Sequence, residues 1–589
     1  GRGRSHFGSR FWRAPARGLR AARGAMKRRR PALGGAARTP QGKRRRRGRP
    51  AEASEGAGAL GVADGLAWLL GGEGAVGAFR GATFERGALH VARPPPEAAG
   101  YYAPLADLSS PEAFFKLLDS GAVEPYRLNM FRCRDGSTKE VPSSPPGSAA
   151  DVRRLFSEGW SVQWLQPQLE HDELARLVSV LESQFGSLVG VNAYLTPPGA
   201  QGLAPHWDDV EVFVLQLGGS KTWSLHQSTS AVPLPPEAQT LPRYSSGDLP
   251  FESLSPPSLR ATLRPGDLLY FPRGTIHYAP NVDSKQPSVH LTISTMQRQT
   301  LFDLTNKTFE EAMSVMWEGD EAMRRAMPWG ALSPGCPAFP SICSSVAGLL
   351  RRLADSVEAE AQGAARAPSQ DPRRVKPAGG GGFTAAALAE LGAEFVRARM
   401  PPPQAAREAS ELVGPTCAVY VPDASALALL PAEGLSGMRL LHCLGNSRRG
   451  HMMSHPPGPG ASDAEEGEEE EVASQEDEAG GGEGEDGEEA SGGGDEGVLL
   501  SPFAAAAVSA LCAAAPGTPL ASRPARGTPA GGLQVEALLQ QVGAPRRLWP
   551  GVCAELTQVA AHGLLAVVGG GAGAAAEAPF ERAATEPSA

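Results

Sequence analysis

The chain has 589 residues, enough for about two to four domains. Its 71 glycines and 53 prolines make up about a fifth of the residues, whereas aromatic residues are only 6%. This composition excludes a fibrous protein and a single compact body of this length, and indicates folded domains joined to low-complexity segments. The net charge of -8 hides two opposite segments. Residues 1–50 contain 18 Lys and Arg and no acid, and residues 463–496 contain 17 Asp and Glu and no base.

Residues 1–57 are predicted to form a disordered basic tail. The basic runs 27–30 and 43–49 cannot pack and stay solvated. They predict targeting to the nucleus and nucleolus, with non-specific nucleic-acid contact. The alternative is a biased stretch without a role. Met26 is the first methionine and a candidate start of the native chain.

The cysteines and the apolar runs limit the cellular compartments in which we expect the chain. The seven cysteines are scattered, odd in number and without a Cys-x-x-Cys pair. This argues against a disulfide framework or a cysteine-type zinc site, and favours a reducing compartment. No run reaches about 18 clean apolar residues, so we expect no membrane partner. The basic N-terminus has no apolar segment after it, so we expect no secretory signal.

Residues 58–300 are predicted to form the catalytic domain. Residues 167–186 have the apolar spacing of an amphipathic helix, with Asp172 as its N-cap. Short β-rich runs then alternate with Gly/Pro turns, at Asn192–Leu195, Val210–Leu217, Lys221–Leu225, Leu268–Phe271 and His290–Ser294. Gly218 and Gly219 between two of these runs predict a hairpin. The close spacing predicts a barrel or double-sheet jelly roll, with its core at about 186–298.

The chain becomes helical again over 301–358, where one apolar stripe consists of Val346, Leu349, Leu350, Leu353 and Val357. Residues 359–382 are predicted to be a linker. A second domain is predicted over 383–570, interrupted by a disordered acidic insertion at 456–497, and a disordered tail follows at 571–589. The insertion is interpreted as a solvated spacer, and the alternative is attraction of histones or basic ribosomal proteins.

The most informative segment is His206-Trp207-Asp208, with His277 following 69 residues after the aspartate. On a strand, residues 206 and 208 would point to the same face. Two histidines and one carboxylate form the facial triad of non-heme Fe(II) oxygenases, which leaves positions open for a bidentate cosubstrate and dioxygen. The short motif alone is weak evidence, because it occurs by chance in many chains.

The surroundings of His277 strengthen this interpretation. The run LRPGDLLYFPRGTIH (263–277) resembles the second metal-binding motif of cupin barrels. The residues at that motif's spacing are Gly266, Pro272, Gly274, His277 and Asn281. Both halves of the motif occur in the right order, so the alternative of a purely structural barrel is disfavoured.

A 2-oxoacid needs an anchor for its distal carboxylate. Lys221 lies in a strand-like run, where a half-buried lysine needs an anionic partner to keep its charge. The alternative is a strand-edge lysine that faces water. Asn192, Tyr194 and Thr292 are polar residues in apolar strands. They are candidates for hydrogen bonds to the same ligand, although each alone could be a satisfied core polar group.

The remaining histidines do not suggest a second metal site. His226 is interpreted as a surface residue at a strand end, and His290 as a residue facing the mouth of the site. His442, His451 and His455 lack the spacing of a closed site. We therefore expect a single metal centre.

The sequence resembles the JmjC-domain ribosomal oxygenases, which are 2-oxoglutarate-dependent enzymes related to bacterial ribosomal-protein arginine hydroxylases. The segments that carry this resemblance are VGVNAYLTPPGAQGLAPHWDDVEVFVLQ (189–216), residues 263–277 and HLTISTMQR (290–298). Of the two nucleolar animal types it resembles ribosomal oxygenase 2 more. The likeness is close over 100–300 and looser over 301–450. Trp207 stands where the family usually has tyrosine.

The resemblance implies an α+β fold: a double-stranded β-helix (cupin, jelly-roll, JmjC) barrel with flanking helices, a helical dimerisation region and a C-terminal winged-helix domain. It implies the cofactors Fe(II), 2-oxoglutarate and O2, and it makes His206, Asp208 and His277 the metal ligands. Lys221 becomes the partner of the distal carboxylate. The residues that line the 2-oxoglutarate pocket become Asn192, Tyr194 and Thr292.

Three functions follow as hypotheses. The first is hydroxylation of a histidine side chain in a large-subunit ribosomal protein, linked to ribosome biogenesis, by a homodimer. The second is demethylation of methyl-lysine on histone H3 by the same chemistry. The third is a non-catalytic scaffold in ribosome assembly or chromatin, against which the complete set of metal and cosubstrate residues argues.

Overall fold

The structure is a computed structural model that describes residues 60–568 with internal gaps. The gaps are 99, 134, 229–237, 282–283, 330, 334–335, 362–381, 403–412, 414–417, 422–423, 432–436, 445, 447, 453–496, 515–532 and 563. The predicted basic tail, most of the linker, the acidic insertion and the C-terminal tail therefore lie outside the described residues, as do Cys417 and His455. The described residues belong to one compact unit, Ala59–Ala589.

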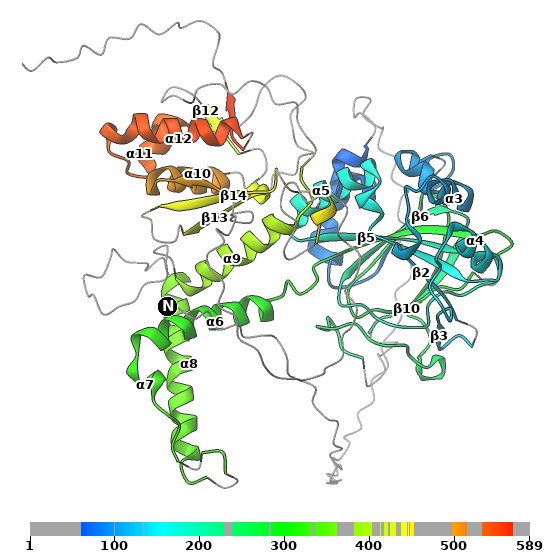
Figure 1. Cartoon of the computed structure of the whole chain (residues 1–589), viewed down its shortest axis with the longest axis horizontal. Helices are drawn as coiled ribbons and strands as arrows, with labels where there is room; N and C mark the ends of the chain where they lie inside the picture. The colour runs from blue at the N-terminus through cyan, green and yellow to red at the C-terminus, as the bar shows by residue number, and fades with distance from the viewer. Residues whose placement is uncertain are drawn as a thin grey trace, which may run out of the picture. The chain divides into compact units, whose positions relative to one another are not determined.

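The N-terminal half consists of helices around two antiparallel sheets (Figure 1). Its α-helices are α1 (Leu66–Leu70), α2 (Glu73–Ala78), α3 (Pro111–Asp119), α4 (Ala149–Ser157) and α5 (Asp172–Phe185). Its strands are β1 (Leu89–Val91), β2 (Leu128–Cys133), β3 (Lys139–Glu140), β4 (Ser161–Leu165), β5 (Val189–Thr196), β6 (Glu211–Gly218), β7 (Lys221–His226), β8 (Leu259–Leu263), β9 (Leu268–Phe271), β10 (Ile276–Tyr278) and β11 (Ser288–Thr295).

The two sheets face each other as a jelly roll. The large sheet has the order β1-β9-β6-β11-β5-β4-β2-β3, and the small sheet has the order β10-β7-β8. Strands adjacent in the chain, such as β6 and β7, lie in different sheets. This is the double-stranded β-helix that the sequence predicted, and the α+β fold class is confirmed.

Side-chain alternation along the large sheet separates a packing face from a site face. In β5 the odd-numbered residues from Val189 to Leu195 join the core beneath α5, whereas Tyr194 and Thr196 line the cavity. Strand β6 is buried on both faces, because Val212 and Val214 contact the small sheet whereas Phe213 joins the core under the helices. This explains its nearly unbroken apolar run.

Two local predictions are wrong. Gly218 and Gly219 do not form a hairpin, because β6 pairs with β9 and β11 whereas β7 pairs with β8 and β10. The pair instead carries the chain from one sheet to the other. A Cβ atom on either glycine would collide with a backbone carbonyl, that of Ser109 or Pro287, and Gly219 has a φ of +61°. The N-cap of α5 is His171 rather than Asp172, since His171 Nδ1 accepts the Leu174 N–H at 3.2 Å.

After the barrel, the described residues form four α-helices: α6 (Leu301–Gly319), α7 (Glu321–Arg324), α8 (Phe339–Ala361) and α9 (Phe383–Ala398). The apolar stripe predicted around Leu350 lies on α8. The stripe is only partly covered in this chain, since Val346 is 49% exposed and Leu350 is 51% exposed. The helical prediction is confirmed in its secondary structure, and dimerisation stays a prediction.

The C-terminal elements form two small sheets, β16-β12-β17 and β13-β14-β15, together with three helices. They are β12 (Ala418–Tyr420), β13 (Leu427–Pro431), β14 (Met438–His442), β15 (Val498–Leu500), α10 (Pro502–Ala514), β16 (Leu533–Gln534), α11 (Val535–Gln541), α12 (Trp549–Ala561) and β17 (Ala566–Val568). The three helices share one apolar core with the strands. The winged-helix assignment itself stays a prediction. Among the described residues, no helix combines the length and hydropathy needed to cross a bilayer.

Candidate active site

Three predicted metal ligands converge between the two sheets. Ligand atoms of His206, Asp208 and His277 all lie within 4.8 Å of one another. His277 belongs to β10, whereas His206 forms only an isolated β-bridge to it, with His277 N–H donating to the His206 carbonyl at 2.8 Å. The expectation that residues 206 and 208 lie on a regular strand is therefore wrong, although their side chains do converge.

Backbone carbonyls orient both imidazoles. The Nδ1–H of His206 donates to the Ala204 carbonyl at 2.7 Å, and the Nδ1–H of His277 donates to the Thr275 carbonyl at 3.0 Å. These bonds place the proton on Nδ1 and leave Nε2 with a free lone pair. The Nε2 atoms lie 3.9 Å and 3.7 Å from one carboxylate oxygen of Asp208. Three donors thus face a common point.

Burial keeps the His277 ring neutral. The residue is 6% exposed, and burial lowers its pKa to about 4, with the neighbouring His206 acting in the same direction. A neutral imidazole is the form that binds a metal ion, so the ring is ready to act as a ligand at neutral pH.

Lys221 is the buried cation of the same cavity. It is the first residue of β7 and is 7% exposed. Its Nζ donates to Thr196 Oγ1 at 2.9 Å, and no carboxylate among the described residues forms an ion pair with it. Burial therefore lowers the pKa of Lys221 to about 7. The water-facing alternative is wrong, and the ammonium suits an anionic ligand.

The three predicted pocket residues lie on the central strands. Tyr194 on β5 and Thr292 on β11 line the cavity. The Tyr194 hydroxyl accepts from Gln163 Nε2 at 2.8 Å, and burial raises the pKa of Tyr194. Asn192 is paired with Thr292 across the strands and does not line the cavity.

The structure adds residues that the sequence did not single out. Thr196 holds the Lys221 ammonium and is 1% exposed. Its position, two residues after Tyr194 on the same strand, is the signal that could have identified it. His290 lies deep in the cavity rather than at its mouth, with its ring 5.0 Å from that of Tyr194. Burial and then the Lys221 charge hold the pKa of His290 well below its usual value.

Two expectations about neighbouring residues are revised. His226 is buried rather than on the surface, since it ends β7 at 3% exposure and its ring stacks 5.8 Å from that of Tyr278. Trp207 points away from the cavity, because its Nε1 donates to the Tyr244 carbonyl at 3.1 Å. Trp207 is therefore not part of the cavity lining.

One potential metal cluster exists among the described residues, and it is the one above. His442 lies on β14 with its ring 5.4 Å from that of His562, and His451 is part of a buried polar network. Neither belongs to a group of three or more suitable ligands in that part of the chain.

The comparisons with known proteins agree with this geometry. The family model of the JmjC domain matches residues 163–303, which include all three convergent ligands and Lys221. This stretch of the chain is similar to a JmjC domain. The match covers the strands from β4 to β11 of the jelly roll.

The chain is also similar to ribosomal oxygenases of both types. The chain is 38% identical over 277 residues to ribosomal oxygenase 2 of Rattus norvegicus, covering 47% of this chain and 56% of the relative. It is 42% identical over 187 residues to ribosomal oxygenase 1 of Homo sapiens, covering 31% and 28%. The chain spans less than three fifths of the length of these relatives.

Among solved structures, the chain is similar to the ribosomal oxygenase YcfD of Escherichia coli in complex with cobalt and 2-oxoglutarate. The sequence identity is 12% and the TM-score is 0.36, covering 84% of this chain and 98% of that one. The structure of YcfD with cobalt and succinic acid gives the same identity and TM-score.

The residues of the JmjC site fit Fe(II) and a 2-oxoacid. Two imidazoles and one carboxylate on one side match the donor set of non-heme iron sites. The buried Lys221 ammonium, without a carboxylate partner among the described residues, fits the distal carboxylate of the cosubstrate. The three candidate metal ligands and Lys221 line the same cavity.

Proposed function

We propose that the chain is an Fe(II)- and 2-oxoglutarate-dependent oxygenase that hydroxylates a histidine side chain of a large-subunit ribosomal protein. The observation that carries the proposal is the pairing of two features in one cavity. His206, Asp208 and His277 line this cavity together with the buried Lys221, whose strand β7 pairs with the β10 strand of His277.

Each residue has a defined task in this chemistry. When bound, Fe(II) and 2-oxoglutarate use one O2 to hydroxylate a C–H bond, with the cosubstrate leaving as succinate and CO2. His206, Asp208 and His277 hold the metal and leave one side open. Lys221 binds the distal carboxylate, and Thr196 fixes the direction of its ammonium.

The rest of the cavity orients ligands and excludes water. The hydroxyls of Tyr194 and Thr292 offer hydrogen bonds to a ligand lying between Lys221 and the metal ligands. Trp223 and Phe271 pack their rings 6.0 Å and 4.7 Å from that of His277, so the metal-facing imidazole has an apolar backing. A dry wall strengthens the electrostatic interactions inside the site.

The ribosomal substrate is supported by the names of the relatives, ribosomal oxygenases 1 and 2. The test is to incubate purified protein, Fe(II), ascorbate and 2-oxoglutarate with a panel of histidine-containing ribosomal peptides and methyl-lysine histone H3 peptides. We expect a 2-oxoglutarate-dependent mass gain of one oxygen atom on a ribosomal peptide, and none with His206→Ala. Loss of a methyl group from a histone peptide would instead establish a demethylase, and iron binding without turnover of any peptide would favour the scaffold.

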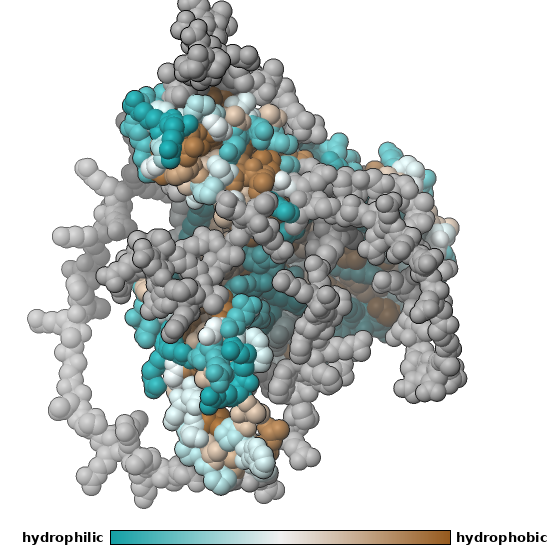
Figure 2. All heavy atoms as spheres, turned by 60° about the vertical axis from the view of Figure 1, so that its left-hand side comes forward, coloured by the Kyte–Doolittle hydropathy of each residue, from teal (hydrophilic) through white to brown (hydrophobic). Residues whose placement is uncertain are grey.

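The proposed enzyme is a homodimer joined through its post-barrel helices. Large apolar residues are exposed there, including Phe302 at 54%, Trp317 at 56% and Leu350 at 51%. Figure 2 shows brown, apolar patches among hydrophilic residues on the described surface. Apolar surface of this kind is typical of subunit interfaces. We expect light scattering to give a dimer mass for the wild type and a monomer mass for Leu350→Glu, and a wild-type monomer would refute this assembly.

The proposed location is the nucleus and nucleolus. The proposal is supported by the basic runs at 27–30 and 43–49, which also suit non-specific nucleic-acid contact. A fluorescent fusion of the full chain should concentrate in nucleoli. Replacing both runs with glycine and serine should release it to the cytoplasm, and unchanged nucleolar signal would contradict the assignment.

A further inference from the structure

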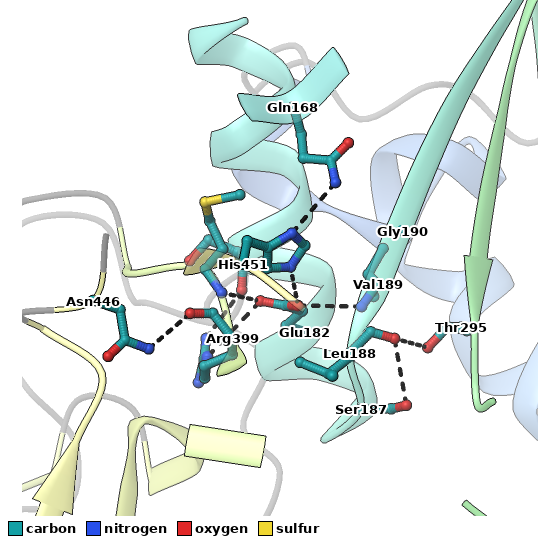
Figure 3. A network of polar contacts seen from close by, with 12 residues as sticks. Gln168, Glu182, Ser187, Leu188, Val189, Gly190, Thr295, Arg399, Asn446 and His451 are labelled. Atoms are coloured by element: carbon teal, nitrogen blue, oxygen red, sulfur yellow. Dashed lines mark hydrogen bonds and ion pairs between the residues drawn. The ribbon is translucent and has the colours of Figure 1, made fainter. Parts of the chain in front are cut away.

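A buried charged network lies outside the active site and joins the jelly-roll domain to the C-terminal region, meaning the residues from 399 onward. Its centre is Glu182 on α5, which has no exposed surface (Figure 3). Arg399, just after α9, is also fully buried, and His451 is 1% exposed. Burying three ionisable side chains is unfavourable unless each finds partners, so their arrangement calls for an explanation.

Both oxygens of the Glu182 carboxylate are used. Oε1 accepts from His451 Nε2 at 2.8 Å and from the backbone N–H of Val189 at 3.1 Å. Oε2 accepts from the backbone N–H of Met400 at 2.8 Å and lies 4.0 Å from the Arg399 guanidinium. One carboxylate thus binds the first residue of β5 and two segments of the C-terminal region.

The partners of Glu182 are themselves fixed in direction. The Gln168 amide lies 3.3 Å from His451 Nδ1, and as the donor there it places the imidazole proton on Nε2, facing Glu182. Arg399 donates to the Ser179 carbonyl and the Ser183 hydroxyl, both on α5. The positive charge of Arg399 thus lies beside the carboxylate of Glu182.

The C-terminal region touches β5 a second time. Met452 follows His451, and its backbone N–H donates to the Ala398 carbonyl at 2.8 Å. Its sulfur lies 3.3 Å from where a Cβ atom on Gly190 would be placed. Strand β5 therefore meets the C-terminal region at two positions. Val189 is linked to His451 through Glu182, and Gly190 lies next to the Met452 side chain.

Strand β5 carries the cosubstrate end of the cavity. Tyr194 lines the cavity and Thr196 holds the Lys221 ammonium, five and seven residues after Val189. We propose that Glu182 is a positioning residue through which His451 and Met400 of the C-terminal region stabilise the start of β5. Docking of the C-terminal region then becomes part of what holds the 2-oxoglutarate pocket in shape.

Hydrogen exchange tests the coupling without any turnover. In the full chain, His451→Ala removes the donor to Glu182 and should speed amide exchange in β5 by roughly five- to a hundredfold, the effect of leaving a buried acceptor unsatisfied. His451→Gln, which can return an N–H to the same place, should restore slow exchange. Arg448→Gln is the matched control, because Arg448 pairs with Asp172 of α5 only at the exposed surface.

A second variant keeps the test decisive if His451→Ala fails to fold. Glu182→Gln keeps the shape of the side chain but replaces one accepting oxygen with a donor, and should speed exchange in β5 in the same way. Unchanged β5 exchange in both His451→Ala and Glu182→Gln, with faster exchange only at 446–452, would overturn the proposal, because the segment would then be a local tether. Equal acceleration across the whole barrel would also overturn it.

The affinity for 2-oxoglutarate gives a further readout, and this one rests on the proposed function. Calorimetry on the metal-loaded chain should show weaker 2-oxoglutarate binding in His451→Ala, restored in His451→Gln and unchanged in Arg448→Gln. If the wild type binds no 2-oxoglutarate, the proposed function fails while the exchange result still decides the coupling. Faster β5 exchange with unchanged 2-oxoglutarate affinity would overturn the link to the pocket.

Discussion

Replacing Lys221 by methionine should raise the stability of the ligand-free protein and abolish tight cosubstrate binding. The ammonium is buried with Thr196 as its hydrogen-bond partner, and its pKa is about 7 instead of 10.5. That difference corresponds to about 5 kcal/mol between the charged and neutral forms. Relaxation and water entry reduce the effect, so we expect Lys221→Met to stabilise the folded state by about 1–4 kcal/mol at pH 7.

The gain should depend on pH in a defined direction. Between pH 10.5 and about 7, the unfolded chain binds a proton at Lys221 that the folded chain does not, so wild-type stability falls as the pH falls through this window. The variant lacks this loss. Its advantage should therefore be largest at and below pH 7 and should shrink as the pH rises toward 10.5.

Cosubstrate binding should change in the opposite sense. Removing one partner of a buried charge pair costs about 2–5 kcal/mol of binding free energy. The dissociation constant of 2-oxoglutarate should therefore rise by roughly 30- to 5000-fold. Urea unfolding at pH 7 and 9 and calorimetry with metal-loaded protein measure the two effects. Thr222→Ala is the control, since Thr222 is the next residue on β7 and bonds to Thr262 on the outside of the small sheet. Lower stability in Lys221→Met, with a dissociation constant within threefold of wild type, would show that Lys221 is not the buried cation that binds the cosubstrate.

Three further predictions concern the metal site and the fold. Asp208→Ala should reduce bound iron, measured by metal analysis after dialysis, to background while the melting temperature stays within a few degrees; retained iron would contradict the ligand assignment. Trp207→Tyr should change 2-oxoglutarate turnover by less than about threefold, because residue 207 faces Tyr244 and not the cavity, and a tenfold loss would show that this residue reaches the site. Gly219→Ala should destabilise the fold by more than about 1 kcal/mol, because its φ of +61° and the Pro287 carbonyl leave no room for a Cβ atom; an unchanged urea midpoint would argue against this crossover geometry.

The three residues of the candidate metal site could be predicted from the sequence because their chemistry is rare and their spacing is informative. Two histidines and an aspartate in the order of a cupin motif leave few other interpretations, and the strand Leu268–Phe271 was predicted to the residue. Lys221 and Tyr194 followed from the rule that a polar residue in an apolar strand needs a partner.

Other features could not be predicted because they depend on distant parts of the chain. The two glycines at 218 and 219 look like a hairpin turn locally, and only the pairing of β7 with β8 and β10 shows that they connect two sheets. Glu182 and His451 are separated by 269 positions, so nothing local in either segment indicates their contact. His226 is polar and ends a strand, and only the packing against Tyr278 buries it.

If the proposed function is right, this cavity transfers an oxygen atom from O2 to a histidine of a ribosomal protein. Tandem mass spectrometry detects this transfer in ribosomal peptides treated with the protein, Fe(II), 2-oxoglutarate and isotopically labelled O2, with Asp208→Ala as the control. We expect one labelled oxygen on a histidine side chain, formed only with 2-oxoglutarate and only by the wild type. An unlabelled product, oxygen on another residue type, or equal product from Asp208→Ala would contradict it.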